Sequence, residues 1–419
     1  MSSKSASFNK NVLTLVSGTG LAQFITMVSA PFITRLYTPD DMGYFTVIMS
    51  IAGFIAIAGT FRYEMAIVLP RDDEEASGVF SLSALILVCV SLFTALGVYL
   101  AKQFQAFGLE EIHYTYAGII PLLVFTIGCG NILQHWLNRR RQYRMISISK
   151  TLNSVGVNSL TIWMGVASLG LGGLVMGSLL GTFVFVVALV FSLNRADRKI
   201  LTLLGYGKMQ SQARTYRKLA ITNTPQALIE AFQVHGVVYM LILFFSSTVI
   251  GWYGLALRVL QAPLWLIGSS LSQVFFREAS DLVGDGASTL RPLMMKAFKV
   301  STAIAVPLVV VLVFFGPDMF SLVFGEGWAP SGQYAAILAP WLGLDFIRYV
   351  IGQLPVVLNR TGTMFRITLV GNLFLVGFVA SGAYFFNDIV VTLSMVSAVM
   401  SVYTVGVIVW IMRLTGNKS

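Results

Sequence analysis

The sequence predicts an all-α integral membrane protein, with twelve transmembrane helices in two six-helix lobes related by pseudo-twofold symmetry around a central cavity. Of its 419 residues, 56% are hydrophobic and only 11% are charged. A soluble core could not bury this much apolar surface. Apolar runs long enough to span a bilayer also alternate with short polar loops throughout the chain. Finally, the two halves of the chain repeat similar loop sequences.

The first lobe is expected to cover residues 1–193. Its first apolar run follows a short basic N-terminus and has no small-residue cleavage site, so we expect an uncleaved helix. In the loop TPDDMGYF, Pro39 presets φ for a turn and Gly43 permits a positive φ. The six predicted spans are 12–34, 44–61, 79–100, 116–136, 146–167 and 169–193.

The second lobe is expected to cover residues 222–419. The segment before it, 194–221, is the longest basic and polar stretch of the chain, and we interpret it as a cytoplasmic loop that joins the lobes. The six predicted spans that follow are 222–245, 249–275, 297–315, 334–358, 367–386 and 389–412.

The basic residues indicate the orientation, because Lys and Arg in short loops stay on the cytoplasmic side. With the N-terminus inside, all but four of the 28 basic residues fall in predicted cytoplasmic segments, whereas the outer loops are mainly acidic. Both termini are therefore predicted to be cytoplasmic. The four exceptions are Lys102, Arg35, Arg258 and Arg348.

Two sequence echoes suggest that the lobes form a parallel repeat. TPDDMGYF and SSTVIGWYG each place a glycine before two aromatic residues at an outer hairpin, and LNRRRQYR and LNRTGTMFR each follow the fourth span of a lobe. Each pair lies about half the chain length apart. Because basic and aromatic residues are common at membrane helix ends, unrelated helix ends are the alternative explanation.

Polar residues within the spans predict the wall of a polar cavity. Arg258, Gln261 and Trp265 follow helical spacing on one face of the eighth span. Since an arginine at this depth is costly, it normally faces a bundle interior or a wet cavity. Interhelical hydrogen bonding is the alternative for the amide side chains. The seventh span carries a similar stripe of Asn223, Gln226, Glu230 and Gln233.

Three further intramembrane residues are ambiguous. Asp345 precedes Arg348 by three residues on one helix face, so this pair can neutralise itself. His235 is a weak candidate for a proton carrier, since a lone histidine is more often a packing residue. We find no G-x-x-x-x-G-K-[ST], H-E-x-x-H or G-x-S-x-G motif, so we expect neither an enzyme nor a metal or other cofactor. A secondary transporter is the default interpretation.

The chain also resembles a known family. The stretch R-L-Y-T-P-D-D-M-G-Y-F from Arg35 and the stretch R-Y-E-M-A-I-V-L-P-R-D-D-E-E-A from Arg62 are similar to the N-terminal signature of Wzx-type polysaccharide transporters. These are lipid-linked oligosaccharide flippases of the multidrug/oligosaccharidyl-lipid/polysaccharide exporter superfamily. We assign the signature to Arg35, Pro39, Gly43, Arg62 and Glu64.

The resemblance implies a V-shaped pair of lobes that moves undecaprenyl-pyrophosphate-linked oligosaccharide, such as an O-antigen unit, by alternating access. The direction would be from the inner to the outer leaflet of a bacterial cytoplasmic membrane. Its implied partners are membrane lipids, the lipid-linked glycan, a polysaccharide polymerase and chain-length proteins. Nucleic acid is not expected, because the basic residues are distributed among loops between spans.

The chemistry of a pyrophosphate gives this resemblance a physical reason. Hydrocarbon rejects its charge, so a flippase needs cations along a wet path, and the planar fork of arginine can bind two phosphate oxygens. The candidate substrate-binding residues are Arg258, Gln261, Arg348 and Arg35. The candidates for coupling to H⁺ or Na⁺ are Glu230, Asp345 and His235. The alternative function is efflux of organic cations, which would favour carboxylates in the cavity. A third possible function is that of a membrane glycan polymerase or ligase.

Overall fold

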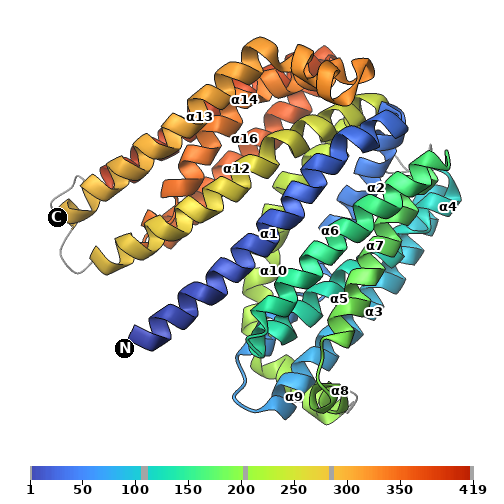
Figure 1. Cartoon of the computed structure of the whole chain (residues 1–419), viewed down its shortest axis with the longest axis vertical. Coiled ribbons are helices and arrows are strands. Elements are labelled where there is room, and N and C mark those ends of the chain that lie inside the picture. The colour runs from blue at the N-terminus through green and yellow to red at the C-terminus, as the bar shows by residue number, and fades with distance from the viewer. Residues whose placement is uncertain (1, 105–111, 202–205, 283–286, 416–419) are drawn as a thin grey trace. The chain divides into compact units, whose positions relative to one another are not determined.

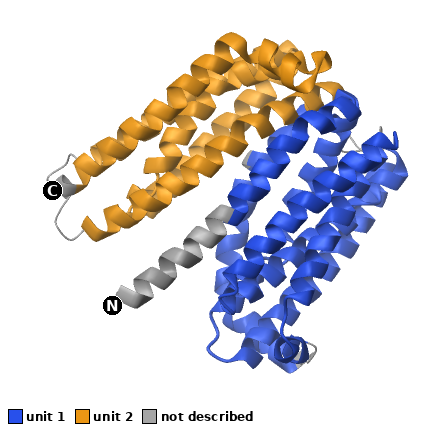
Figure 2. Cartoon of the chain, in the orientation of Figure 1, with its two compact units in different colours: residues 1–243 blue, residues 244–419 orange. Residues whose placement is uncertain are grey.

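The computed structural model describes residues 2–104, 112–201, 206–282 and 287–415 of the chain, and every regular element in these ranges is a helix (Figure 1). These helices form two compact units, residues Met1–Leu243 and Phe244–Ser419 (Figure 2). The predicted seventh span therefore packs with the first unit. The predicted lobe boundaries at residues 193 and 222 stay predictions.

The first unit contains the helices that precede Leu243. Its core is apolar, and Trp136, Ile48, Leu87 and Ile67 are among its fully buried side chains. The predicted inter-lobe loop is partly helical, because α8 and α9 form within it. The elements are α1 Ser2–Leu36, α2 Pro39–Ala58, η1 Tyr63–Val68, α3 Asp73–Gln103, α4 Tyr114–Ala117, α5 Ile120–Arg139, α6 Tyr143–Val166, α7 Leu171–Phe191, α8 Arg195–Leu201, α9 Tyr206–Thr215, α10 Arg217–Ala231, η2 Phe232–Gly236 and α11 Val237–Ile242.

The second unit is built around α14, which packs against α12, α13 and α17. Gly316 of α13 and Gly332 of α14 allow the closest approach, since a Cβ on Gly332 would lie 2.3 Å from the carbonyl oxygen of Gly316. The elements are α12 Ser247–Leu282, α13 Ala287–Phe324, η4 Glu326–Trp328, α14 Ala329–Ile351, α15 Leu354–Val357, α16 Thr361–Phe386 and α17 Ile389–Arg413.

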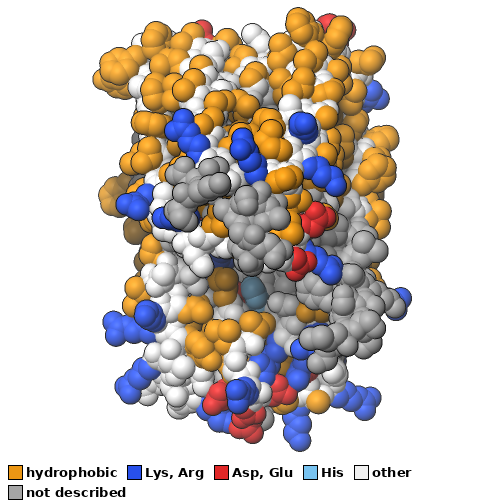
Figure 3. Space-filling model, turned by 90° about the vertical axis from the view of Figure 1, so that its left-hand side faces the viewer, with side chains coloured by type: hydrophobic (Ala, Val, Ile, Leu, Met, Phe, Trp, Pro, Cys, Tyr) orange, Lys and Arg blue, Asp and Glu red, His pale blue; other side chains and the backbone are white. Residues whose placement is uncertain are grey.

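Nine helices in the described part of the chain are long and apolar enough to cross a membrane. The chain is therefore an all-helical, multi-pass membrane protein, and the count of twelve spans stays a prediction. The predicted seventh span is divided among α10, the π-helix η2 and α11. On the face shown in Figure 3, hydrophobic side chains dominate the upper part, whereas acidic and basic side chains gather at the lower end.

Candidate functional site

The loop between α1 and α2 is held by a capping box. The Thr38 hydroxyl accepts a hydrogen bond of 3.1 Å from the Asp41 backbone N–H, and the Asp41 carboxylate accepts one of 3.3 Å from the Thr38 N–H. Pro39 occupies the first helical position, where its missing N–H costs nothing. Gly43 lies buried inside α2, so the expectation that it forms a turn with positive φ is wrong. A helix N-terminus, with its own cap, replaces the predicted glycine turn.

Two further contacts connect this loop to α6 and α7. The second oxygen of Asp41 accepts a hydrogen bond of 3.0 Å from the backbone N–H of Leu171, the first residue of α7. Tyr37 is only 3% exposed, and its hydroxyl donates a bond of 2.7 Å to the carbonyl oxygen of Thr161 in α6. Burial and the nearby Asp41 carboxylate raise the pKa of Tyr37 to about 12, because both disfavour the phenolate. The first half of the signature therefore connects the loop between α1 and α2 to α6 and α7.

The second half of the signature contains a buried ion pair. Phe61 and Arg62 have φ values of 47° and 60°, a left-handed conformation that costs about 1–2 kcal/mol per residue. This bend brings the Arg62 guanidinium 3.6 Å from the carboxylate of Glu64, which is only 3% exposed. The Thr60 hydroxyl donates a second bond to the Glu64 carboxylate. These contacts compensate a carboxylate that would otherwise be buried without a partner.

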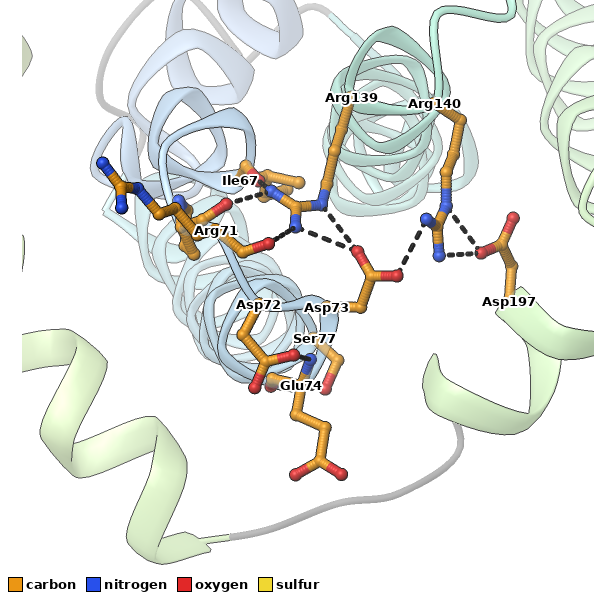
Figure 4. A network of polar contacts seen from close by, with 10 residues as sticks. Ile67, Arg71, Asp72, Asp73, Glu74, Ser77, Arg139, Arg140 and Asp197 are labelled. Carbon is orange, nitrogen blue, oxygen red and sulfur yellow. Dashed lines mark hydrogen bonds and ion pairs between the residues drawn. The ribbon is translucent and has the colours of Figure 1, made fainter.

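A network of charged residues joins the end of α5 to the start of α3 (Figure 4). Arg139, the last residue of α5, donates bonds of 3.2 and 2.9 Å to one carboxylate oxygen of Asp73. It also donates to the backbone carbonyls of Ile67 and Pro70, at 3.3 and 2.5 Å. A single guanidinium therefore closes the whole loop from η1 to α3.

Arg140 extends this network to α8. Its guanidinium donates a bond of 2.9 Å to Asp73 and one of 2.8 Å to Asp197, which is only 1% exposed (Figure 4). Burial lowers the pKa of Arg140, but the hydrogen bonds and charges of both carboxylates outweigh it and raise the pKa overall. Nearby, Lys208 of α9 pairs with Glu74 of α3. We interpreted these basic residues only as orientation signals, but in the fold they bind the polar segments together.

The predicted stripe on α12 is accessible in the second unit. Arg258, Gln261 and Trp265 have exposed side chains. Within the described ranges, no carboxylate forms an ion pair with Arg258. The helix therefore presents a guanidinium, an amide and an indole along one accessible face.

Arg348 lies in α14 and is paired, as its spacing predicts. Its Nε donates a bond of 2.7 Å to Asp345, and the two side chains are 23% and 33% exposed. Tyr403 of α17 interacts electrostatically with both members of the pair. The prediction that Asp345 and Arg348 neutralise each other is confirmed, so in this conformation Arg348 is less available to an anion than Arg258.

The remaining candidates do not gather around one point. Arg35 is exposed near the end of α1, and the Glu230 carboxylate is exposed on α10, where it accepts a bond of 3.1 Å from Gln226. His235 is half-buried in the π-helix η2 and lines an apolar cavity of the first unit. The side chain of Gln233 lies outside the described residues. The sequence therefore identified polar positions without identifying which of them meet.

The helix-packing role of one cation was missed by sequence reasoning. Lys150, which we assigned to a cytoplasmic segment, is half-buried in the second turn of α6, and its ammonium lies 3.5 Å from the Thr19 hydroxyl of α1. The same interface continues with a bond of 2.7 Å from Ser154 to the carbonyl of Ala22.

These features define a class of protein: a multi-pass helical membrane protein with accessible cationic and polar groups on membrane-spanning helices. The model of a family described as polysaccharide biosynthesis protein matches residues 32–333, so the chain belongs to this family. The recognition of a polysaccharide transporter family from the sequence is thus confirmed. The matched region includes Arg35, Glu230, His235 and Arg258, and it ends before Asp345.

Similar proteins support the same grouping. The chain is 25% identical over 347 residues to the succinoglycan biosynthesis transport protein ExoT of Rhizobium meliloti (strain 1021), in an alignment that covers 78% of this chain and 66% of that protein, slightly less than two thirds. Its fold resembles the lipid II flippase MurJ in an inward closed conformation, with a TM-score of 0.73, 13% identity, and coverage of 94% and 86% of the two chains. It also resembles an inward-facing MATE family multidrug transporter of the MOP superfamily, with a TM-score of 0.69, 16% identity and coverage of 96% of both chains.

Proposed function

We propose that this protein is a flippase that moves undecaprenyl-pyrophosphate-linked oligosaccharide from the cytoplasmic to the outer leaflet of the bacterial cytoplasmic membrane. Its family and its relatives are those of transport proteins rather than enzymes. Arg258 is the observation that carries the substrate assignment. It is an accessible guanidinium on a membrane-spanning helix, and no carboxylate among the described residues forms an ion pair with it. An anionic ligand is the natural partner for such a group.

The direction follows from the proposed orientation, with both termini in the cytoplasm. A membrane potential that is negative inside favours outward movement of an anion, by about 2.3 kcal/mol per charge for each 100 mV. Coupling to H⁺ or Na⁺ through Glu230, Asp345 or His235 would add to this driving force. A polysaccharide polymerase and chain-length proteins are the partners that we propose for the exported unit.

In this proposal Arg258 binds the pyrophosphate and Gln261, which is three residues further along the accessible face of α12, donates a neutral hydrogen bond. Arg35 is a second accessible cation. Arg348 can contribute only when its pair with Asp345 opens, because its Nε is engaged at 2.7 Å.

Substitution of Arg258 tests the function. Arg258→Gln and Arg258→Ala should abolish surface glycan while protein abundance in the membrane stays normal, and Arg258→Lys should retain part of the export, because the charge survives without the two-point fork. Arg291→Gln is the matched control, since Arg291 is an exposed arginine near the start of α13. Normal glycan export in an Arg258→Ala strain at ordinary expression would refute the assignment.

Efflux of organic cations is the second candidate function, and the accessible carboxylate of Glu230 favours it. The two functions make opposite predictions for the charged groups. A cation transporter should lose activity with Glu230→Gln and keep it with Arg258→Gln, whereas an anionic-lipid flippase should show the reverse. Drug resistance and surface glycan measured in the same strains distinguish the two.

A further inference from the structure

The first unit contains a partly open apolar cavity of about 730 Å³. It lies between α2, α3 and the segment formed by η2 and α11, and we call it the α2–α3 cavity. Its volume falls within the roughly 300–1,000 Å³ that is typical of small-molecule sites. Its apolar wall includes Ile51, Phe54, Phe61, Val90, Phe93 and Phe232.

The wall excludes charged ligands. No Lys, Arg, Asp or Glu is among the described residues that line the cavity. The hydroxyl of Thr94, one of its few polar side chains, already donates a bond of 2.8 Å to the carbonyl of Val90 in its own helix. The other polar side chains of the wall are Ser50, His235 and Tyr239. A pyrophosphate placed here would lose its water without gaining a Lys or Arg partner, whereas a hydrocarbon chain would lose nothing.

The cavity is shaped by unusual local structure. η2, at Phe232–Gly236, is a π-helix, and such turns within α-helices occur frequently at functional sites. It places Phe232 edge-on against Phe54, with ring centroids 6.4 Å apart and an interplanar angle of 78°. His235 fits against α2 because Gly53 has no side chain, since a Cβ there would lie 2.8 Å from the imidazole.

A second unusual element contributes to the same wall. Phe61 lines the cavity with φ at 47°, and the following residue, Arg62, is also left-handed. Left-handed residues with large side chains persist only where the surrounding structure holds them. The π-helix and this bend come from segments far apart in the chain, and both present an aromatic ring to the same space.

We infer that the α2–α3 cavity binds a segment of the isoprenoid chain of the lipid-linked substrate. This inference rests on the proposed function, which gives the substrate a charged head and a long apolar tail. The charged head needs cations, which the face of α12 that carries Arg258 provides. The apolar tail needs uncharged surroundings, which the α2–α3 cavity provides. Because membrane lipid is as apolar as the chain, selectivity must come from the fit of a branched chain against aromatic rings rather than from exclusion of water.

Gly97 provides a substitution that fills the cavity without disturbing a contact. It lines the cavity from α3, and a Cβ at this position would meet nothing within 4 Å. Gly97→Phe should therefore insert a ring into the open space. Gly377→Phe is the matched control, because Gly377 is also an exposed glycine within a membrane-spanning helix, with nothing within 4 Å of its Cβ, and it lies in the second unit.

The test uses the full chain in lipid nanodiscs and two probes, an undecaprenyl diphosphate with a photoreactive diazirine in its isoprenoid chain and a phospholipid with the same group in an acyl chain. After illumination, labelled peptides are mapped. The isoprenoid probe should label the segments around Phe93 and Phe232 saturably, with at least about tenfold less labelling in Gly97→Phe and no change in Gly377→Phe.

Four results would overturn the inference. Equal labelling of the cavity in wild type and Gly97→Phe would do so, and so would equal labelling by the two probes, since the cavity would then hold bulk lipid. Saturable labelling only outside the cavity would refute the tail site while leaving the proposed function intact. If the isoprenoid probe labelled no segment saturably, the proposed function would fail together with the inference.

Discussion

The hydroxyl of Tyr37 donates a 2.7 Å hydrogen bond to the backbone carbonyl of Thr161, across 124 residues of sequence. The ring fits there because Gly165 and Gly173 leave room for it, since a Cβ on Gly173 would lie 2.5 Å from the hydroxyl. Tyr37 belongs to the stretch that identifies the family in the sequence. The contacts of Tyr37 indicate that this residue helps to position α1, α2, α6 and α7.

Replacement of Tyr37 by phenylalanine should therefore lower stability without changing substrate specificity. Loss of a buried hydrogen bond costs about 0.5–1.5 kcal/mol, and the ring packing survives. The midpoint of thermal unfolding in detergent should fall for Tyr37→Phe and stay constant for Tyr99→Phe, because Tyr99 is 60% exposed. Equal midpoints for wild type and Tyr37→Phe would contradict the structural role of the hydroxyl.

The same residue predicts a pH dependence. Because the pKa of Tyr37 is raised to about 12 in the fold from its ordinary value of 10.0, its contribution to stability is fully present below pH 10 and is lost as the pH rises through about 12. Across this window, wild type should lose about 2–3 kcal/mol more stability than Tyr37→Phe. Unfolding midpoints of both proteins at pH 9, 10, 11 and 12 check this, and parallel curves would count against it.

Arg140 should be a stabilising residue rather than a ligand for an anion. Arg140→Gln leaves Asp197, which is 1% exposed, without its cation, and loss of a hydrogen bond to a charged group costs about 1.5–3 kcal/mol. Arg141→Gln is the control, since Arg141 is an exposed arginine with a left-handed backbone. Adding Asp197→Asn to Arg140→Gln should recover part of the stability. If the double variant is no more stable than the single one, the pair does not act as a unit.

The sequence predicted most of the local features of the fold. The apolar runs correspond to most of the long helices, and the spacing of Asp345 and Arg348 correctly predicted their pair. These features depend on residues within a few turns of one another or on helix composition alone, both of which the sequence displays directly.

Contacts between distant segments could not be predicted. Asp73 and Asp197 reach Arg140 across 67 and 57 residues, and no local pattern links the three. The π-helix at Phe232–Gly236 could not be predicted from the sequence either, because it differs from an α-helix only in its hydrogen-bond register. The sequence therefore does not predict the cavity that this helix lines, although it identifies His235 as a weak candidate for a proton carrier.

One sequence echo has a local explanation. After α5, Arg141 has a left-handed backbone, and the N–H of Gln142 donates a hydrogen bond of 2.9 Å to the carbonyl of Leu137. After α15, Asn359 has a left-handed backbone, and the N–H of Arg360 donates a hydrogen bond of 2.7 Å to the carbonyl of Pro355. This arrangement is a Schellman motif, which ends many helices. The motif does not fall at the same place in the two segments, however. The left-handed residue follows the shared L-N-R letters in the first segment, as Arg141, but is the asparagine of those letters in the second, as Asn359. The second echo thus adds little support for a repeat.

The predicted orientation can be tested with single cysteines at glycines that have free space around their Cβ positions. Gly327 lies in a predicted outer loop, and Gly207 and Gly362 lie in predicted cytoplasmic segments; all three are exposed. In a chain from which Cys89 and Cys129 have been removed, an impermeant thiol reagent should label Gly327→Cys in intact cells. It should label the other two only after permeabilisation.

Two other loop positions suit this test less well, because Glu110 lies outside the described residues and Gln212 is only 7% exposed. Labelling of Gly207→Cys in intact cells, with Gly327→Cys protected, would reverse the orientation. It would also reverse the proposed direction of transport, since both rest on the same assignment of sides.

The pair of Asp345 and Arg348 makes the last prediction, which concerns coupling. An i, i+3 ion pair stabilises a helix by only about 0.2–0.5 kcal/mol, and this one is partly accessible, so a cation that binds Asp345 can release Arg348 for an anionic substrate. Asp345→Asn imitates the neutral carboxyl. Transport by Asp345→Asn in proteoliposomes should lose the dependence on an imposed H⁺ or Na⁺ gradient that wild type shows, while binding of undecaprenyl diphosphate persists.

Asp318→Asn is the control, because Asp318 is an exposed carboxylate near the end of α13, and this variant should keep the gradient dependence. Unchanged gradient dependence in Asp345→Asn would exclude this pair as the coupling site, and wild-type transport indifferent to pH, Na⁺ and voltage would exclude ion coupling altogether.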